Sequence, residues 1–242
     1  MANWCWDRFA IFNKDSSEEG KSELNQLWLR LNRALDGELT PDETRYKGSY
    51  YDSESKCLKE SEDCHVANDW YGNIFVVHGE KPDTIEGCRG SIQDLRFEDT
   101  GAGEAIFIDA ETAWSPMDDK IAEMLDKYYE HLGFVFTAEE PGNCIYVNTD
   151  RDGDFFVERW KLDGEILGDY ISDYIDCYFE NESQVEDALD IIDEKVKEKY
   201  PEYKGSKDPV LSNGARIDKI LEFCKEHGDE DAWMYLYEFE YE

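Results

Sequence analysis

The run Asn148-Thr-Asp-Arg-Asp-Gly-Asp154 places side-chain oxygens at alternate positions around a glycine, as in the first half of a calcium-binding loop. The ligand pattern then fails, because position twelve of such a loop is Arg159 and the glutamate, Glu158, comes one residue early. The flanking residues also predict strands instead of the two helices of a calcium-binding hand. We therefore expect an acidic β-hairpin and no calcium site.

Cysteine and histidine are the next candidates for metal binding or nucleophilic catalysis. Cys64-His65 lies seven residues after Cys57, but two or three ligands do not complete a zinc site. The cysteine count is odd and no Cys-x-x-Cys pair occurs, which favours reduced thiols: Cys5, Cys57, Cys64, Cys88, Cys144, Cys177 and Cys224. We expect no metal, no cofactor and no catalytic residue.

Carboxylates are the remaining chemistry-bearing side chains. The chain of 242 residues has 59 Asp and Glu against 25 Lys and Arg, a net charge of −34. A surface that binds duplex DNA or an anionic membrane needs clustered cations, so this balance excludes direct nucleic-acid binding and membrane docking as default functions. Apolar residues make up 40% of the chain, enough for a folded core.

The acids are unevenly distributed. Residues 163–200 contain 13 acids and three lysines, and residues 229–242 contain six acids and no base. One amphipathic helix, Ser183–Tyr200, separates its apolar stripe from an acidic face. We select as partner-binding residues Glu186, Asp187, Asp190, Asp193, Glu194 and Glu198 on this helix. Secondary candidates are Asp173, Asp176, Asp229, Glu230 and Asp231.

Strands and helices alternate in the elements that precede this helix. A strand at 9–12 leads into a helix at 22–35, and residues 40–68 read as a polar insertion. A further helix follows Ser115 as N-cap and Pro116 as first residue, and ends before Gly133. The other predicted strands are 74–77, 92–97, 105–109, 134–136, 144–147 and 155–157, the last two joined across Asp152-Gly153.

The C-terminal residues predict two helices and a strand. Ser183 and Glu186 have capping-box spacing, and a second helix covers Ile217–His227 before Gly228. Residues 170–179 fit both helical and strand periods. The final strand carries alternating aromatic residues, namely Trp233, Tyr235, Tyr237, Phe239 and Tyr241.

Two stretches of the chain resemble a known family. Asn3-Trp4-Cys5, which opens into a strand, and Ala110-Glu-Thr-Ala-Trp-Ser-Pro116, which ends one strand and starts a helix, are similar to motifs of the YubB ferredoxin-like or Api92-like family of phage and plasmid proteins. The resemblance covers residues 1–165, interrupted by the polar insertion. It implies a ferredoxin-like antiparallel sheet with helices on one face, and an origin in a mobile element.

Together these features predict an α+β protein with a ferredoxin-like domain at 1–165, a polar insertion at 40–68 and an acidic α/β extension at 166–242. No apolar run approaches the roughly 20 residues of a membrane span, so we expect a cytoplasmic protein.

A rigid acidic surface presents a field like that of polyphosphate to a cationic groove. We therefore expect a non-enzymatic phage or prophage protein that inhibits a host nucleic-acid-binding defence protein, a CRISPR effector or a restriction enzyme, by nucleic-acid mimicry. Three alternatives remain: an immunity protein for a basic nuclease toxin, a metal-dependent enzyme that uses clustered carboxylates, and a structural or replication accessory protein.

Overall fold

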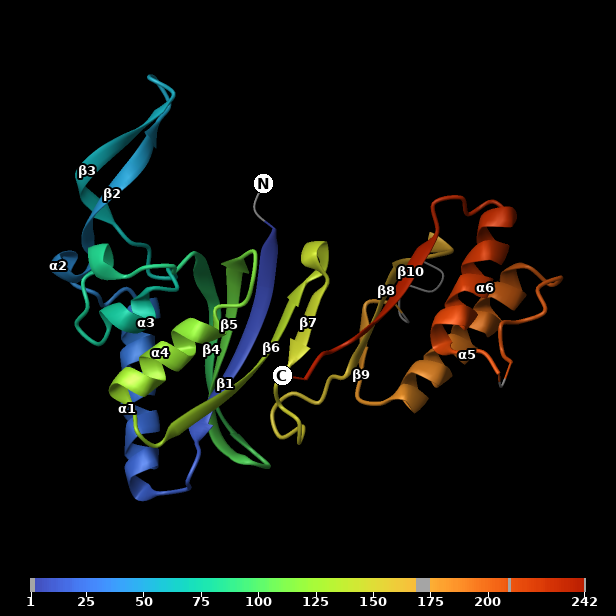
Figure 1. The fold of residues 1–242 in the computed structure, drawn as a ribbon, viewed down its shortest axis with the longest axis horizontal. Helices are drawn as coiled ribbons and strands as arrows, with labels where there is room; N and C mark the ends of the chain where they lie inside the picture. The colour runs from blue at the N-terminus through green and yellow to red at the C-terminus, as the bar shows by residue number, and fades with distance from the viewer. Residues whose placement is uncertain (1–2, 169–174, 209, 242) are drawn as a thin grey trace. The chain divides into compact units, whose positions relative to one another are not determined.

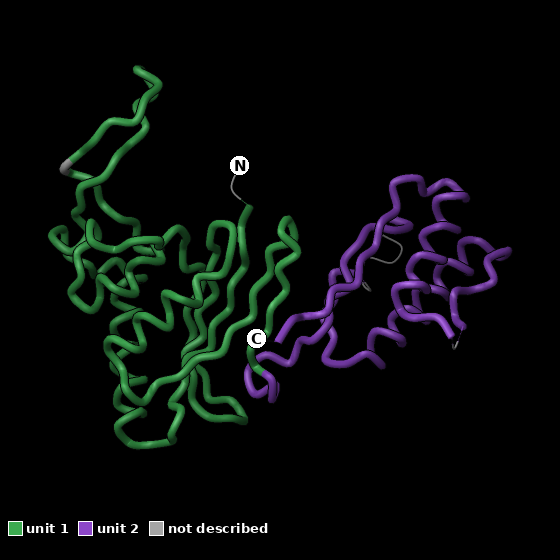
Figure 2. Tube along the Cα trace, viewed as in Figure 1, with its two compact units in different colours: residues 1–150 green, residues 151–242 purple. Residues whose placement is uncertain are grey.

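A computed structural model describes residues 3–168, 175–208 and 210–241. The chain forms two compact units, Met1–Asp150 (unit 1) and Arg151–Glu242 (unit 2), each with its own hydrophobic core (Figure 2). The division lies before the expected one at residue 165, because strand β8 (Trp160–Glu165) pairs with β10 (Trp233–Glu238) and belongs to unit 2. Helices and antiparallel sheets occur together, which confirms the α+β class.

Unit 1 contains a five-stranded antiparallel sheet in the order β4-β5-β1-β6-β7 (Figure 1). Strand β1 is central and pairs Phe9 with Ile108 of β5 and with Phe136 of β6. The strand bounds are β1 Trp4–Asn13, β4 Gly90–Thr100, β5 Gly103–Ala113, β6 Leu132–Glu140 and β7 Ile145–Asn148.

One face of this sheet is covered by α1 (Glu18–Leu35), α3 (Asn73–Val76) and α4 (Asp118–Tyr128) (Figure 1). Phe9 and Ile11 of β1 share a core with Leu27 and Leu31 of α1, and all four are fully buried. Ser17 caps α1 because its hydroxyl accepts the Gly20 N–H at 3.0 Å.

The polar segment 40–68 contains a short helix and a hairpin, α2 (Pro41–Thr44), β2 (Arg45–Asp52) and β3 (Cys57–His65). The two strands pair with each other and form a separate two-stranded sheet. None of the side chains described in this segment is buried. The segment therefore has regular backbone hydrogen bonding without a core of its own.

Two of the predicted strands, at 74–77 and 155–157, are wrong. Ile74-Phe-Val76 lies in the helix α3, since a short run of buried apolar residues fits a buried helical turn as well as a strand. Residues 155–157 form no strand, and β7 pairs with β6 instead. A 3₁₀ turn, η2 (Pro141–Asn143), closes that hairpin, because the Glu140 carboxylate accepts the N–H groups of Gly142 and Asn143.

The start of α4 also differs from the prediction. The helix begins at Asp118 after Met117, which provides no side-chain cap, so Ser115 is not the N-cap. The backbone carbonyl of Ser115 instead accepts a hydrogen bond from the Thr112 hydroxyl at 2.9 Å. The helix ends at Tyr128, and the glycine predicted to follow it, Gly133, lies within β6.

Unit 2 contains a three-stranded antiparallel sheet in the order β10-β8-β9, with β9 at Cys177–Phe179. Helices α5 (Glu182–Lys199) and α6 (Asn213–Glu226) share a core with this sheet through Leu162, Met234, Leu189 and Ile220. In β10, the Tyr235 ring lies next to the rings of Trp233 and Tyr237, tilted by about 40° to each, on the face opposite Met234. The strand ends at Glu238, and Phe239 after it is fully buried, so the predicted aromatic face does not continue to Tyr241.

Among the residues described in the two units, none of the helices combines the length and apolarity needed to cross a bilayer.

A buried carboxyl lies beneath the junction between β5 and α4. Asp7 of β1 is 1% exposed, and its Oδ2 lies 2.6 Å from the Thr112 hydroxyl, which also faces the Ser115 carbonyl. The Thr112 hydroxyl donates to Asp7 and so favours the charged carboxylate, but the loss of solvent around Asp7 outweighs this bond. Burial accordingly raises the pKa of Asp7 to about 6.

This carboxyl makes stability depend on pH. Because the folded-state pKa lies above the ordinary value of 3.8, Asp7 costs stability as pH rises from about 4 to 6, by about 3 kcal/mol above pH 6. Asp7→Asn removes the buried charge and keeps a side-chain oxygen that can accept from the Thr112 hydroxyl. We expect the variant to melt at higher temperature than the wild type at pH 8, and the difference to shrink toward pH 4, measured by circular dichroism. The control, Asp126→Asn in an exposed position of α4, should show no such pH-dependent gain.

Candidate partner-binding surface

Helix α5 positions most of the acids selected from the sequence. Asn181 caps it by accepting the Gln184 N–H at 3.1 Å, and the Gln184 side chain accepts the Glu180 N–H at 2.8 Å. These two hydrogen bonds stand in place of the predicted capping box of Ser183 and Glu186. Four apolar side chains on one face are fully buried and fix the rotation of the helix: Val185, Leu189, Ile192 and Val196.

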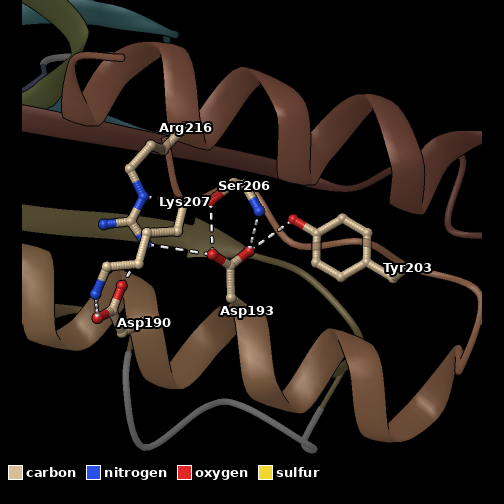
Figure 3. A network of polar contacts seen from close by, with 6 residues as sticks. All are labelled: Asp190, Asp193, Tyr203, Ser206, Lys207 and Arg216. Atoms are coloured by element: carbon tan, nitrogen blue, oxygen red, sulfur yellow. Dashed lines mark hydrogen bonds and ion pairs between the residues drawn. The ribbon is translucent and has the colours of Figure 1, made fainter. Parts of the chain in front are cut away.

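Asp193 does not face solvent. The residue is 8% exposed, and its carboxylate accepts hydrogen bonds from the Tyr203 hydroxyl at 2.6 Å and from the N–H and hydroxyl of Ser206 at 2.9 and 2.7 Å (Figure 3). Burial and this carboxylate raise the pKa of Tyr203, which stays a proton donor. Asp193 therefore holds the loop after α5 and does not lie on the exposed acidic face on which the sequence placed it.

Asp190 is also engaged within the protein. It accepts from the Arg216 guanidinium of α6 at 2.7 Å and from the Lys207 ammonium, and Arg216 lies 3.2 Å from Asp193 (Figure 3). The hydrogen bond from Lys207 holds the pKa of Asp190 below its usual value. The side chain of Arg216 is 5% exposed, so the two carboxylates neutralise a buried cation and join α5 to α6.

The other four acids selected on α5 are exposed: Glu186, Asp187, Glu194 and Glu198. At 100° per residue, the last three lie within an arc of about 40° and span roughly 16 Å of helix axis. Glu186 lies on the side of Asp190 and Asp193. We call Asp187, Glu194 and Glu198 the acidic line; within it, Glu198 pairs with Lys195 at 3.2 Å.

The secondary candidates are divided in the same way. Asp173 lies outside the described residues. Asp176 pairs with Lys161 at 3.2 Å, and Asp229 accepts the Leu167 N–H at 2.6 Å. Glu230 and Asp231 are exposed in the turn before β10, and neither has an ion pair with another residue that the structure describes.

A surface groove of about 580 Å³ lies between β9 and α5 and was not predicted from the sequence. Three carboxylates line it, those of Glu158, Glu180 and Asp187, so the groove shares Asp187 with the acidic line. Its apolar wall is formed by Val157, Phe179, Ala188 and Ile191. Residues from a loop, a strand and a helix meet here, and no local spacing in the sequence signals such a meeting.

The cysteine, histidine and carboxylate side chains were also candidates for metal binding. Within the described part of the chain, no three or more His, Cys, Asp or Glu side chains are placed to hold a metal ion. The seven cysteines are free, and burial raises the pKa of Cys88 to about 12 and that of Cys224 to about 11, which keeps both as thiols.

No protein-family model matches the chain, and comparison with curated proteins and with solved structures found no significant match. The chemistry of this surface thus rests on the chain's own residues.

Substitution of the buried Arg216 tests whether its ion pairs hold α5 in place. Arg216→Met leaves the carboxylate of Asp193 buried without its cation, and we expect a loss of about 3 kcal/mol in the free energy of unfolding, measured by urea denaturation. Lys207→Met is the control, because the Lys207 side chain is 72% exposed and its removal should cost less than about 1 kcal/mol. Equal losses in both variants would show that Arg216 does not hold α5 in place.

Proposed function

We propose that this protein is a non-enzymatic inhibitor that binds a host nucleic-acid-handling defence protein, such as a CRISPR effector or a restriction enzyme, and occupies its cationic groove. The observation that carries the proposal is the acidic line Asp187, Glu194 and Glu198 on a helix whose rotation is fixed by a buried ion-pair network. Fixed anions bind a cationic groove without the ordering cost that a floppy acidic tail pays on binding.

The charge of unit 2 supports this proposal. Residues 151–242 contain 27 acids against 11 Lys and Arg. The acidic line extends over roughly 16 Å, a distance in which one strand of duplex DNA presents about five phosphates. Such a field attracts basic proteins and speeds their association.

The fold of unit 1 supports a mobile-element origin. Apart from the insertion at 40–68 and α3, its elements follow the order β1, α1, β4, β5, α4, β6, which is the β-α-β-β-α-β succession of ferredoxin-like proteins. We infer that unit 1 is ferredoxin-like and related to the phage and plasmid family that its Trp4-Cys5 and Trp114-Ser-Pro116 motifs resemble. The partner would then be met in the host cytoplasm.

Charge reversal of the acidic line tests the function. We expect Asp187→Lys combined with Glu194→Lys and Glu198→Lys to lower the affinity for the captured host protein by at least about tenfold, because three attractive charges become repulsive. The measurement is quantitative pull-down of the full chain from host lysate, followed by titration with the identified partner. Glu86→Lys with Asp99→Lys and Glu130→Lys is the control, with the same charge change on exposed acids of unit 1.

The identity of the partner completes the test. Capture of a nucleic-acid-binding defence protein, with DNA or RNA competing for the same groove, supports the proposal. Capture of one cognate nuclease toxin instead identifies an immunity protein. Unchanged affinity after charge reversal would contradict a role for the acidic line.

A further inference from the structure

The groove between β9 and α5 adds shape and apolar surface to the acidic line that it adjoins. We propose that this groove receives an arginine side chain of the partner, with the guanidinium between the carboxylates of Glu180 and Asp187 and its flat face on the apolar wall. The inference rests on the proposed function, because it names the chemistry by which the same surface recognises its partner.

Charge complementarity determines the occupant. No Lys or Arg belongs to the lining of the groove, while three carboxylates do. Glu180 and Asp187 are exposed, and neither forms an ion pair within the residues that the structure describes. A cation that enters the groove therefore meets two carboxylates, those of Glu180 and Asp187, that form no ion pair with other described residues, and a guanidinium bonds two carboxylate oxygens at once.

The same sheet already binds one cation in a similar way. The ammonium of Lys161 lies 5.0 Å from the ring centroid of Tyr178, 3.3 Å from its hydroxyl and 3.2 Å from the Asp176 carboxylate. Tyr178 also lines the groove. An aromatic ring beside a carboxylate thus holds a positive charge in this unit, as cation–π attraction predicts.

The apolar wall favours arginine over lysine. Val157 is 45% exposed, and Phe179 and Ile191 are partly exposed, so a bound side chain must displace water from apolar surface. A guanidinium is planar and weakly hydrated, whereas an ammonium is compact and strongly hydrated and loses more on leaving water. The volume of about 580 Å³ lies within the range of ligand-binding pockets.

Two peptides of equal charge test the inference. Nona-arginine and nona-lysine are titrated into the full chain by calorimetry, and we expect the arginine peptide to bind about tenfold more tightly, the effect of one charge-assisted hydrogen bond. Glu180→Gln with Asp187→Asn keeps the shape of the groove and should bring the ratio of the two affinities close to one. Glu194→Gln with Glu198→Gln, which removes the same charge outside the groove, should weaken both peptides and preserve the ratio.

Two results overturn the inference. If the wild type binds nona-arginine and nona-lysine equally, the preference for arginine does not exist. If the ratio of the two affinities is unchanged in Glu180→Gln with Asp187→Asn, a surface other than the groove produces the preference. The proposed function survives either result, because it needs only the field of the acidic line. That function fails by a separate result, unchanged capture of the host protein after charge reversal of the line.

Discussion

The buried ion-pair network of Arg216, Asp190 and Asp193 is the interaction on which unit 2 depends. A guanidinium in the interior is tolerated only when carboxylates compensate its charge and every remaining donor finds an acceptor. Ser206 and Tyr203 complete that requirement at Asp193. Since the network joins α5 to α6, it acts together with the buried apolar face of α5 to fix the rotation of this helix.

The network divides the acids of one helix by position. Asp190 and Asp193 stabilise the fold, and the acidic line lies on another side of the helix, where its three side chains are exposed. Apolar packing of Val185 and Leu189 contributes the rest of the constraint on rotation. A rigid carboxylate surface is what distinguishes this chain from a disordered acidic segment of the same composition, and the groove beside Asp187 adds apolar contact that charge alone does not provide.

The sequence predicted the elements with clear periodicity. Helices α1, α5 and α6 and strands β1, β4 and β5 lie near their expected positions, because their buried residues recur at helical or strand spacing. The sequence-based prediction was wrong where contacts between distant residues determine whether a side chain is buried. Asp193 belongs by spacing to the polar face, and its burial depends on residues 10 to 23 positions further along the chain. One signal was present: Arg216 directly precedes Ile217, in register with the apolar positions of α6, and a basic residue there calls for a buried carboxylate. The groove gave no signal, because a loop, a strand and a helix contribute to it.

Hydrogen–deuterium exchange of the full chain bound to its captured partner tests the central claim most directly. The account predicts that protection on this chain is strongest in residues 180–198, and that protection on the partner follows its cationic nucleic-acid groove. Protection confined to an uncharged patch elsewhere, with the partner's groove still open to DNA or RNA, would contradict it.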